Sequence, residues 1–201
     1  MTTGDLLAIE KEQLFEVART MNISELPQLV AYLSEKDDNI RYRAFLLLQY
    51  RSRIQADVYP FWSSFLSKLS SDNSYQRSIG IMLLAENARW DAENRMDNVL
   101  NAYLNLLTNE KPITVRQCIQ SLGIIAACKP KLAETIAKRL MSFDLAKVKE
   151  TMRKSIFLDI VHVLVEIRKT HKTDDIDCFL FDALAGEVLD RKSKKEIEAC
   201  L

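Results

Sequence analysis

Four arginines recur along the chain at nearly equal intervals, and this spacing constrains the fold more than any other feature. Arg41, Arg77, Arg116 and Arg153 lie 36, 39 and 37 residues apart. Each is expected one turn into the second helix of a helical hairpin. A quasi-period of this length is typical of stacked helix pairs, in which each pair buries its apolar face against the next. The sequence therefore predicts a helical repeat protein.

Helices are expected along the whole chain. Glycine and proline number only four each, which is too few for the turns of a β-sheet protein. Apolar residues recur at steps of three and four, as in Leu29, Val30 and Leu33. Ten helices are predicted, at about residues 5–20, 24–35, 39–54, 58–70, 74–89, 95–107, 113–127, 131–142, 147–169 and 174–189.

Local signals support the predicted helix starts. Asp38 or Asn39 is the expected cap of the helix at 39–54, Asn73 that of the helix at 74–89, and Pro112 suits a first turn. A Ser193-x-x-Glu196 capping box would begin a short tail helix. The connections are only a few residues long, so consecutive helices should be antiparallel.

The segments around the four arginines also resemble one another. The shared pattern is Ile/Val-Arg-x-x-Ala/Ile-x-x-Leu, with a turn aspartate such as Asp38 or Asp72 before it, and it is clearest over residues 113–126. This pattern resembles the HEAT repeat over about residues 24–169. It departs at Gln76, which occupies an apolar position, and at Asp159, which replaces the expected leucine.

The resemblance implies an all-α fold, a right-handed α-α superhelix (HEAT/ARM-like solenoid) of about four to five helical hairpins. One domain would span residues 1–201, with a capping helix in 1–23, four repeats in 24–169 and capping helices in 170–201. In such a superhelix the second helices line a concave face that carries recognition. The family implies no single chemistry.

Composition limits the classes of partner. Lysine plus arginine and aspartate plus glutamate each number 28, so the whole molecule has no strong field toward nucleic acid or acidic membranes. Asp5 and Glu10 interrupt the N-terminus before a signal peptide could develop, and no segment is long enough to span a bilayer. The four cysteines form no C-x-x-C pair. We expect a cytoplasmic protein with reduced thiols, as a monomer or weak dimer.

One candidate binding surface lies on the helix at 39–54, which carries Arg41, Arg43, Arg51 and Arg53. Arg41 and Arg53 could flank an exposed strip with Tyr42, Phe45 and Gln49. Such a strip would suit an acidic protein segment. The alternative to an acidic protein segment is nucleic acid. Some proteins with the HEAT fold, including alkylpurine DNA glycosylases, bind DNA in a basic concave groove.

A second candidate site, for a metal ion or for proton transfer, is one polar stripe of the helix at 147–169. Ser155, Asp159, His162, Glu166 and Lys169 recur at steps of 4, 3, 4 and 3, while most neighbours are apolar. This stripe should be the helix's only opening to solvent. Asp159, His162 and Glu166 could bind a metal or exchange protons. A simpler reading is a solvated stripe with intrahelical pairs of Asp159 with His162 and Glu166 with Lys169.

Other residues call for structural explanations. Gly80 and Gly123 lie inside predicted second helices, where close helix packing would explain them. Trp62 is expected in the core, and Trp90 at the surface. The repeated arginines, Arg116 and Arg153 above all, are expected to pair with turn aspartates or helix C-terminal carbonyls of neighbouring repeats.

The sequence therefore predicts a scaffold or adaptor that holds a protein or peptide. No phosphate-binding loop, nucleophile elbow or zinc motif is present, so we expect neither an enzyme nor a cofactor. The predicted contact residues project from second helices: Arg41, Phe45, Gln49, Gln117, Gln120, Asp159, His162 and Glu166.

Overall fold

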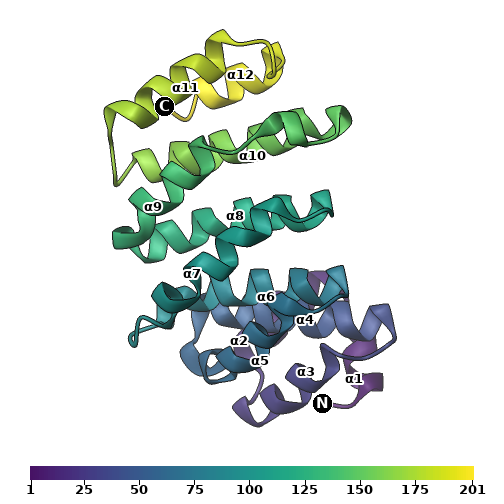
Figure 1. Cartoon of the computed structure of the whole chain (residues 1–201). Coiled ribbons are helices and arrows are strands. Elements are labelled where there is room, and N and C mark those ends of the chain that lie inside the picture. Colours follow the sequence, from purple (N-terminus) through teal and green to yellow (C-terminus); the bar gives the residue numbers. More distant parts are fainter. The chain divides into compact units, whose positions relative to one another are not determined.

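The computed structural model describes residues 1–201 and is helical throughout (Figure 1). Twelve α-helices and seven short 3-10 segments follow one another without a β-strand. The predicted all-α fold is thereby confirmed. The chain divides into two compact units, Met1–Glu93 and Asn94–Leu201, with the boundary between the second and third predicted repeats. None of the helices combines the length and apolar character needed to cross a bilayer.

The N-terminal unit contains six α-helices: α1 Thr3–Ala8, α2 Leu14–Thr20, α3 Leu26–Tyr32, α4 Asp38–Ile54, α5 Trp62–Leu66 and α6 Ser74–Asn87. Helix α3 packs against α4 and α5 against α6, as expected of two hairpins, and α4 also packs against α6. The helix predicted at 58–70 is only partly α-helical. Its ends, 56–61 and 67–70, are 3-10 turns, and Pro60 lies in the first of them.

The prediction of one helix over residues 5–20 is wrong, because the chain is extended at Ile9 and Glu10. The guanidinium of Arg43, on α4, donates hydrogen bonds to the backbone carbonyls of Ile9 and Leu6. A helix end leaves such carbonyls without partners, so a donor placed there favours termination. Nothing within residues 5–20 signals this break, since the donor comes from another helix.

Side-chain caps fix where the long helices begin. Asp37 caps α4 by accepting from the backbone N–H of Asn39 at 2.8 Å, so the predicted cap, Asp38 or Asn39, lies one or two residues too late. Asn73 caps α6 as predicted and accepts from the N–H of Tyr75 at 2.9 Å. Each cap satisfies an N–H that the first turn leaves free.

Close packing in the N-terminal unit confirms the role predicted for Gly80. A Cβ on Gly80 would lie 2.7 Å from the carbonyl oxygen of Phe65, too close for any side chain. Trp62 is buried, as predicted. Trp90 is not the surface residue expected, because it is half-buried and its indole N–H donates to the carbonyl of Ser52 at 2.6 Å.

The C-terminal unit contains the other six α-helices: α7 Arg95–Asn105, α8 Pro112–Cys128, α9 Pro130–Met141, α10 Glu150–Arg168, α11 Asp174–Ala185 and α12 Arg191–Glu198. Helix α10 packs against α8, α9, α11 and α12, and Figure 1 shows α8 and α10 as adjacent layers. Pro112 begins α8 as predicted. Helix α12 is capped by Asp190, which accepts from the N–H of Ser193 at 2.8 Å, so the predicted Ser193 cap is wrong.

Gly123 sets the distance between α8 and α10. A Cβ at this position would lie 3.2 Å from Cγ2 of Val163, so glycine lets the two helices approach. The prediction of close packing at Gly123 is confirmed. The two helices carry most of the residues that form the candidate site.

Candidate functional site

Three of the four repeating arginines bind the chain that leads into their own helix. Each guanidinium donates to a backbone carbonyl five or six residues earlier: Arg41 to Glu35 at 2.9 Å, Arg77 to Ser71 at 2.6 Å and Arg153 to Val148 at 3.0 Å. The prediction that these arginines bind backbone carbonyls is confirmed. The carbonyls belong to the arginine's own hairpin, however, and not to a neighbouring repeat.

Arg116 differs from the other three because it binds the next repeat. Its Nε donates to Oδ2 of Asp159 at 2.6 Å, and its Nη2 donates to Oδ1 at 3.1 Å. Gln120 adds a third hydrogen bond to Oδ1 at 3.0 Å. Asp159 is only 8% exposed, and a buried carboxylate needs such partners. The hydrogen bond from Arg116 to Asp159 is the main reason that the pKa of Arg116 is raised.

The arginines of α4 do not form an open basic face. All four guanidinium groups are bound within the N-terminal unit: Arg41 by Asp38 and the Glu35 carbonyl, Arg43 by the Ile9 carbonyl, Arg51 by Asp57, and Arg53 by Glu86. Arg51 is 8% exposed and also donates to the carbonyls of Ala18 and Arg19, at 3.0 Å each. Their positive charges are therefore largely balanced inside the fold.

Two predicted contact residues on α4 do not lie as expected. Phe45 is 6% exposed, so its assignment to an exposed strip is wrong. Helix α4 packs against α1, α2, α3 and α6, which leaves it a much wider buried face than one hairpin partner would. Gln49 is half-buried and donates to Glu86 at 3.2 Å.

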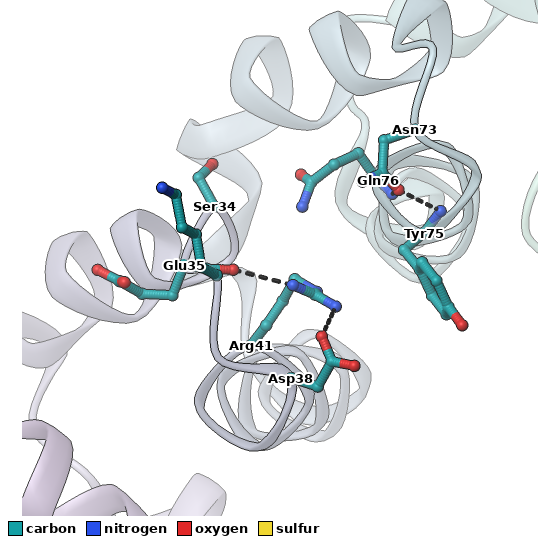
Figure 2. A pocket seen from close by; sticks show the side chains of 8 residues that line it. Ser34, Glu35, Asp38, Arg41, Asn73, Tyr75 and Gln76 are labelled. Atoms are coloured by element: carbon teal, nitrogen blue, oxygen red, sulfur yellow. Dashed lines mark hydrogen bonds and ion pairs between the residues drawn. The ribbon is translucent and has the colours of Figure 1, made fainter.

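Arg41 lines a pocket of about 550 Å³ between the starts of α4 and α6. Figure 2 shows its guanidinium bound to Asp38 and to the Glu35 carbonyl, while Tyr75 extends from α6 on the other side. The guanidinium carbon lies 5.6 Å from the centre of the Tyr75 ring. Arg41 and Asp38, two of the charged residues at this pocket, therefore already have partners within the fold.

A second hollow, of about 490 Å³, lies between α8 and α10 in the C-terminal unit. Its apolar side consists of Gly123, Ile124, Ala127 and Val163. Its polar rim consists of Gln120, Asp159, His162 and Glu166, all of which belong to the predicted contact set. We call this hollow the α8–α10 groove. An apolar hollow with a few convergent polar groups is the usual form of a binding site.

The polar rim makes contacts that the stripe on α10 predicted only in part. Glu166 pairs with Lys169 at 2.7 Å, as predicted. The predicted pair of Asp159 with His162 is wrong, because Asp159 binds Arg116 on α8. His162 Nε2 lies 3.7 Å from a carboxylate oxygen of Glu196 on α12. The stripe is also not uniformly solvated, since Asp159 is buried.

The remaining predicted residue, Gln117, is half-buried on α8 and does not line the groove. Its side-chain oxygen is buried and has no hydrogen-bond partner. No group of three or more His, Cys, Asp or Glu side chains is placed to hold a metal ion. The metal alternative therefore has no assembled ligand set, since Asp159 is bound to Arg116 and Gln120.

The apolar side of the groove was not predicted, although one signal was present. Gly123 and Ala127 are four residues apart and so share a face of α8. Two small residues on one face leave a hollow wherever the facing helix does not fill it. Ile124 and Val163 carry no such signal, because each is one apolar residue among many on its helix.

Comparison with known proteins adds no family to this description. No protein-family model matches the sequence, and a search of curated proteins gives no match. The resemblance to HEAT repeats therefore stays a prediction from the sequence.

Proposed function

We propose that this chain binds another protein and that the α8–α10 groove receives an apolar side chain of that partner. The observation that carries the proposal is the groove itself, an apolar hollow of about 490 Å³ with a polar rim. Open apolar surface of this kind commonly marks an interaction site. The polar rim would orient the backbone and neighbouring side chains of the bound segment.

We further infer that the helix pairs are HEAT-like repeats of a right-handed superhelix. Helices α8 and α10 would then be second helices on its concave face. The repeated arginine contacts support this inference, because three helices bind their own connections in the same way. The glycines inside α6 and α8 support it too, since both permit a close approach of a neighbouring helix.

The rim of the groove suits recognition. Its acids have protein partners, with Asp159 held by Arg116 and Glu166 by Lys169. Asp159, buried and bound by both Arg116 and Gln120, presents a fixed acceptor to a partner and loses little conformational freedom on binding. Nucleic-acid binding through the Arg41–Arg53 face has less support, because all four arginines of that helix are already bound.

Site-directed cross-linking would test the proposal. A photoreactive amino acid at Ala127, which is exposed on the groove, would be compared with one at Thr135, which is exposed on α9. A partner that cross-links from position 127 and not from 135 would be purified and its affinity measured. Ala127→Arg should weaken binding at least tenfold, while Thr135→Arg should leave it unchanged. Equal affinity for wild type and Ala127→Arg would refute this binding site.

A further inference from the structure

The C-terminal unit contains a second cavity, of about 290 Å³, which shares no residue with the α8–α10 groove. It lies among the turn that follows α7, the start of α8, the end of α9 and the connection into α10. Its size is at the lower end of the range for small-molecule sites. Arg139, in the last turn of α9, is the residue that makes this cavity unusual.

Arg139 is half-buried as a residue, and its guanidinium makes no hydrogen bond or ion pair. The positions three and four residues away on α9 and beyond carry no acid, so no local partner is available. Other half-buried or buried arginines of this chain do have acceptors. Arg51, Arg116 and Arg168 bind the carboxylates of Asp57, Asp159 and Asp177, and Arg43 and Arg77 donate to backbone carbonyls. A cation that lines a cavity and has no acceptor within the fold favours binding of an anion.

The other charges on the cavity wall compensate each other. Lys147 lies 3.5 Å from a carboxylate oxygen of Asp144, and the same carboxylate accepts from the N–H of Ala146 at 3.0 Å. This leaves the single positive charge of Arg139. A monoanion would match it, while a dianion such as phosphate would bring one negative charge that nothing on the wall compensates.

The uncharged part of the wall combines the polar residues Thr108, Asn109 and Ser142 with four apolar ones. Leu107 and Val115 are almost fully buried, and Phe143 and Val148 are half-buried. An apolar body next to the anionic group would therefore gain from displacing water here. The guanidinium geometry suits a carboxylate, which it can hold through two parallel N–H···O bonds.

We propose that this cavity binds a carboxylate attached to a small apolar body, with Arg139 holding the carboxylate. The carboxylate has two natural sources, a free organic acid or the C-terminus of a peptide that ends in an apolar residue. This inference does not rest on the proposed function, because it concerns a different cavity.

Calorimetric titration with benzoate would test the proposal. Benzamide is the neutral control ligand, and inorganic phosphate tests whether charge alone is sufficient. Arg139→Gln removes the cation, and Arg191→Gln is the matched control, because Arg191 is an exposed arginine of the same unit without a bonded partner. Benzoate should bind wild type and Arg191→Gln equally and Arg139→Gln at least tenfold more weakly. Benzamide and phosphate should both bind more weakly than benzoate.

A second titration distinguishes the two sources. The peptide Ala-Ala-Phe with a free C-terminus would be compared with its C-terminal amide. Tighter binding of the free peptide than of benzoate would assign the cavity to a chain terminus, and the reverse would assign it to a small acid. The proposal is overturned if neither probe binds, if Arg139→Gln binds benzoate as well as wild type does, or if phosphate binds as tightly as benzoate.

Discussion

The guanidinium of Arg116 and the carboxylate of Asp159 join α8 to α10, with Nε 2.6 Å from Oδ2. The same carboxylate forms part of the rim of the α8–α10 groove. One ion pair therefore holds two helices together and fixes an edge of the proposed binding surface.

Removing one member of this pair should destabilise the fold. Asp159→Ala leaves Arg116 and Gln120 without their acceptor, and we expect a loss of about 2 kcal/mol in the free energy of unfolding. The cost should stay below that of a fully buried pair, because the Arg116 side chain is 33% exposed and can turn to water. Urea denaturation would measure the loss. The double variant Arg116→Met/Asp159→Leu should recover most of it, and wild-type stability of Asp159→Ala would contradict the assigned role.

The two helical glycines should respond differently to alanine. Gly80→Ala places a Cβ 2.7 Å from the backbone oxygen of Phe65, so α5 and α6 must separate, at a cost of about 1 to 3 kcal/mol. Gly123→Ala meets only a side-chain methyl of Val163 at 3.2 Å, and the better helix propensity of alanine offsets part of that strain. Thermal unfolding should therefore rank Gly80→Ala as the less stable variant. Gly4→Ala, where only an ordinary contact at 3.7 Å arises, is the neutral control.

The arginine at position 51 should not be replaceable by lysine. Its guanidinium binds both oxygens of Asp57, at 3.1 and 3.0 Å, together with two backbone carbonyls. Lysine offers one ammonium group and cannot reach all four acceptors. Arg51→Lys should cost about 2 kcal/mol in denaturant unfolding. Arg53→Lys, at a side chain that is 43% exposed, should cost clearly less. If Arg51→Lys and Arg53→Lys lost the same unfolding free energy, burial of Arg51 would not be the reason for its larger contribution.

The four cysteines should separate into classes of reactivity toward a thiol reagent. Burial raises the pKa of the Cys118 thiol far above its ordinary value, so almost no reactive thiolate forms at that position. Cys178 and Cys200 are exposed, and Cys128 is intermediate. With a chromogenic disulfide reagent at pH 8, the two exposed thiols should react first, and Cys118 only after denaturation. In the Cys128→Ser/Cys178→Ser/Cys200→Ser variant, early labelling of the remaining thiol, Cys118, would contradict its buried position.

Helix α12 should stay docked until the solution is strongly acidic. The hydrogen bond from Lys154, followed by those from Ser193, lowers the pKa of Asp190 well below its ordinary value. A carboxylate with a lowered folded-state pKa stabilises the fold above the unfolded-state value of about 3.9, and this contribution is lost as pH falls through the folded-state pKa. The backbone chemical shifts of residues 191–198 should therefore stay those of a helix between pH 7 and pH 4. Asp190→Asn keeps the capping oxygen and should weaken the helix less than Asp190→Ala does.

The sequence predicts the long helices well because their signals are local. The helix predicted at 39–54 is Asp38–Ile54, and the one predicted at 113–127 is Pro112–Cys128. Apolar periodicity and a first-turn residue such as Pro112 are sufficient for these. The break at Ile9 could not be predicted, because it depends on Arg43, which is 34 residues away.

In the candidate site, too, the features that depend on local sequence were predictable and those that depend on contacts between helices were not. Helical spacing places Asp159, His162 and Glu166 on one stripe of α10, and the structure keeps them together on the groove. Which of these three side chains pairs with a residue of α8 depends on how α8 is placed along α10. The sequence pattern of one helix gives no information on that placement. Phe45 was misplaced for a related reason. Periodicity gives the relative faces of a helix but does not say how many of those faces other helices cover.

The arginine contacts bear on how a chain of this kind could change its length. Arg41, Arg77 and Arg153 each bind a carbonyl of their own helix pair, so a pair that is duplicated or transferred would bring its closing bond with it. The bond from Arg116 to Asp159 crosses from one pair to the next and would be lost if those two pairs were separated. Recombination between pairs should therefore be tolerated unevenly, and the junction between α8 and α10 is a poor place to join foreign segments.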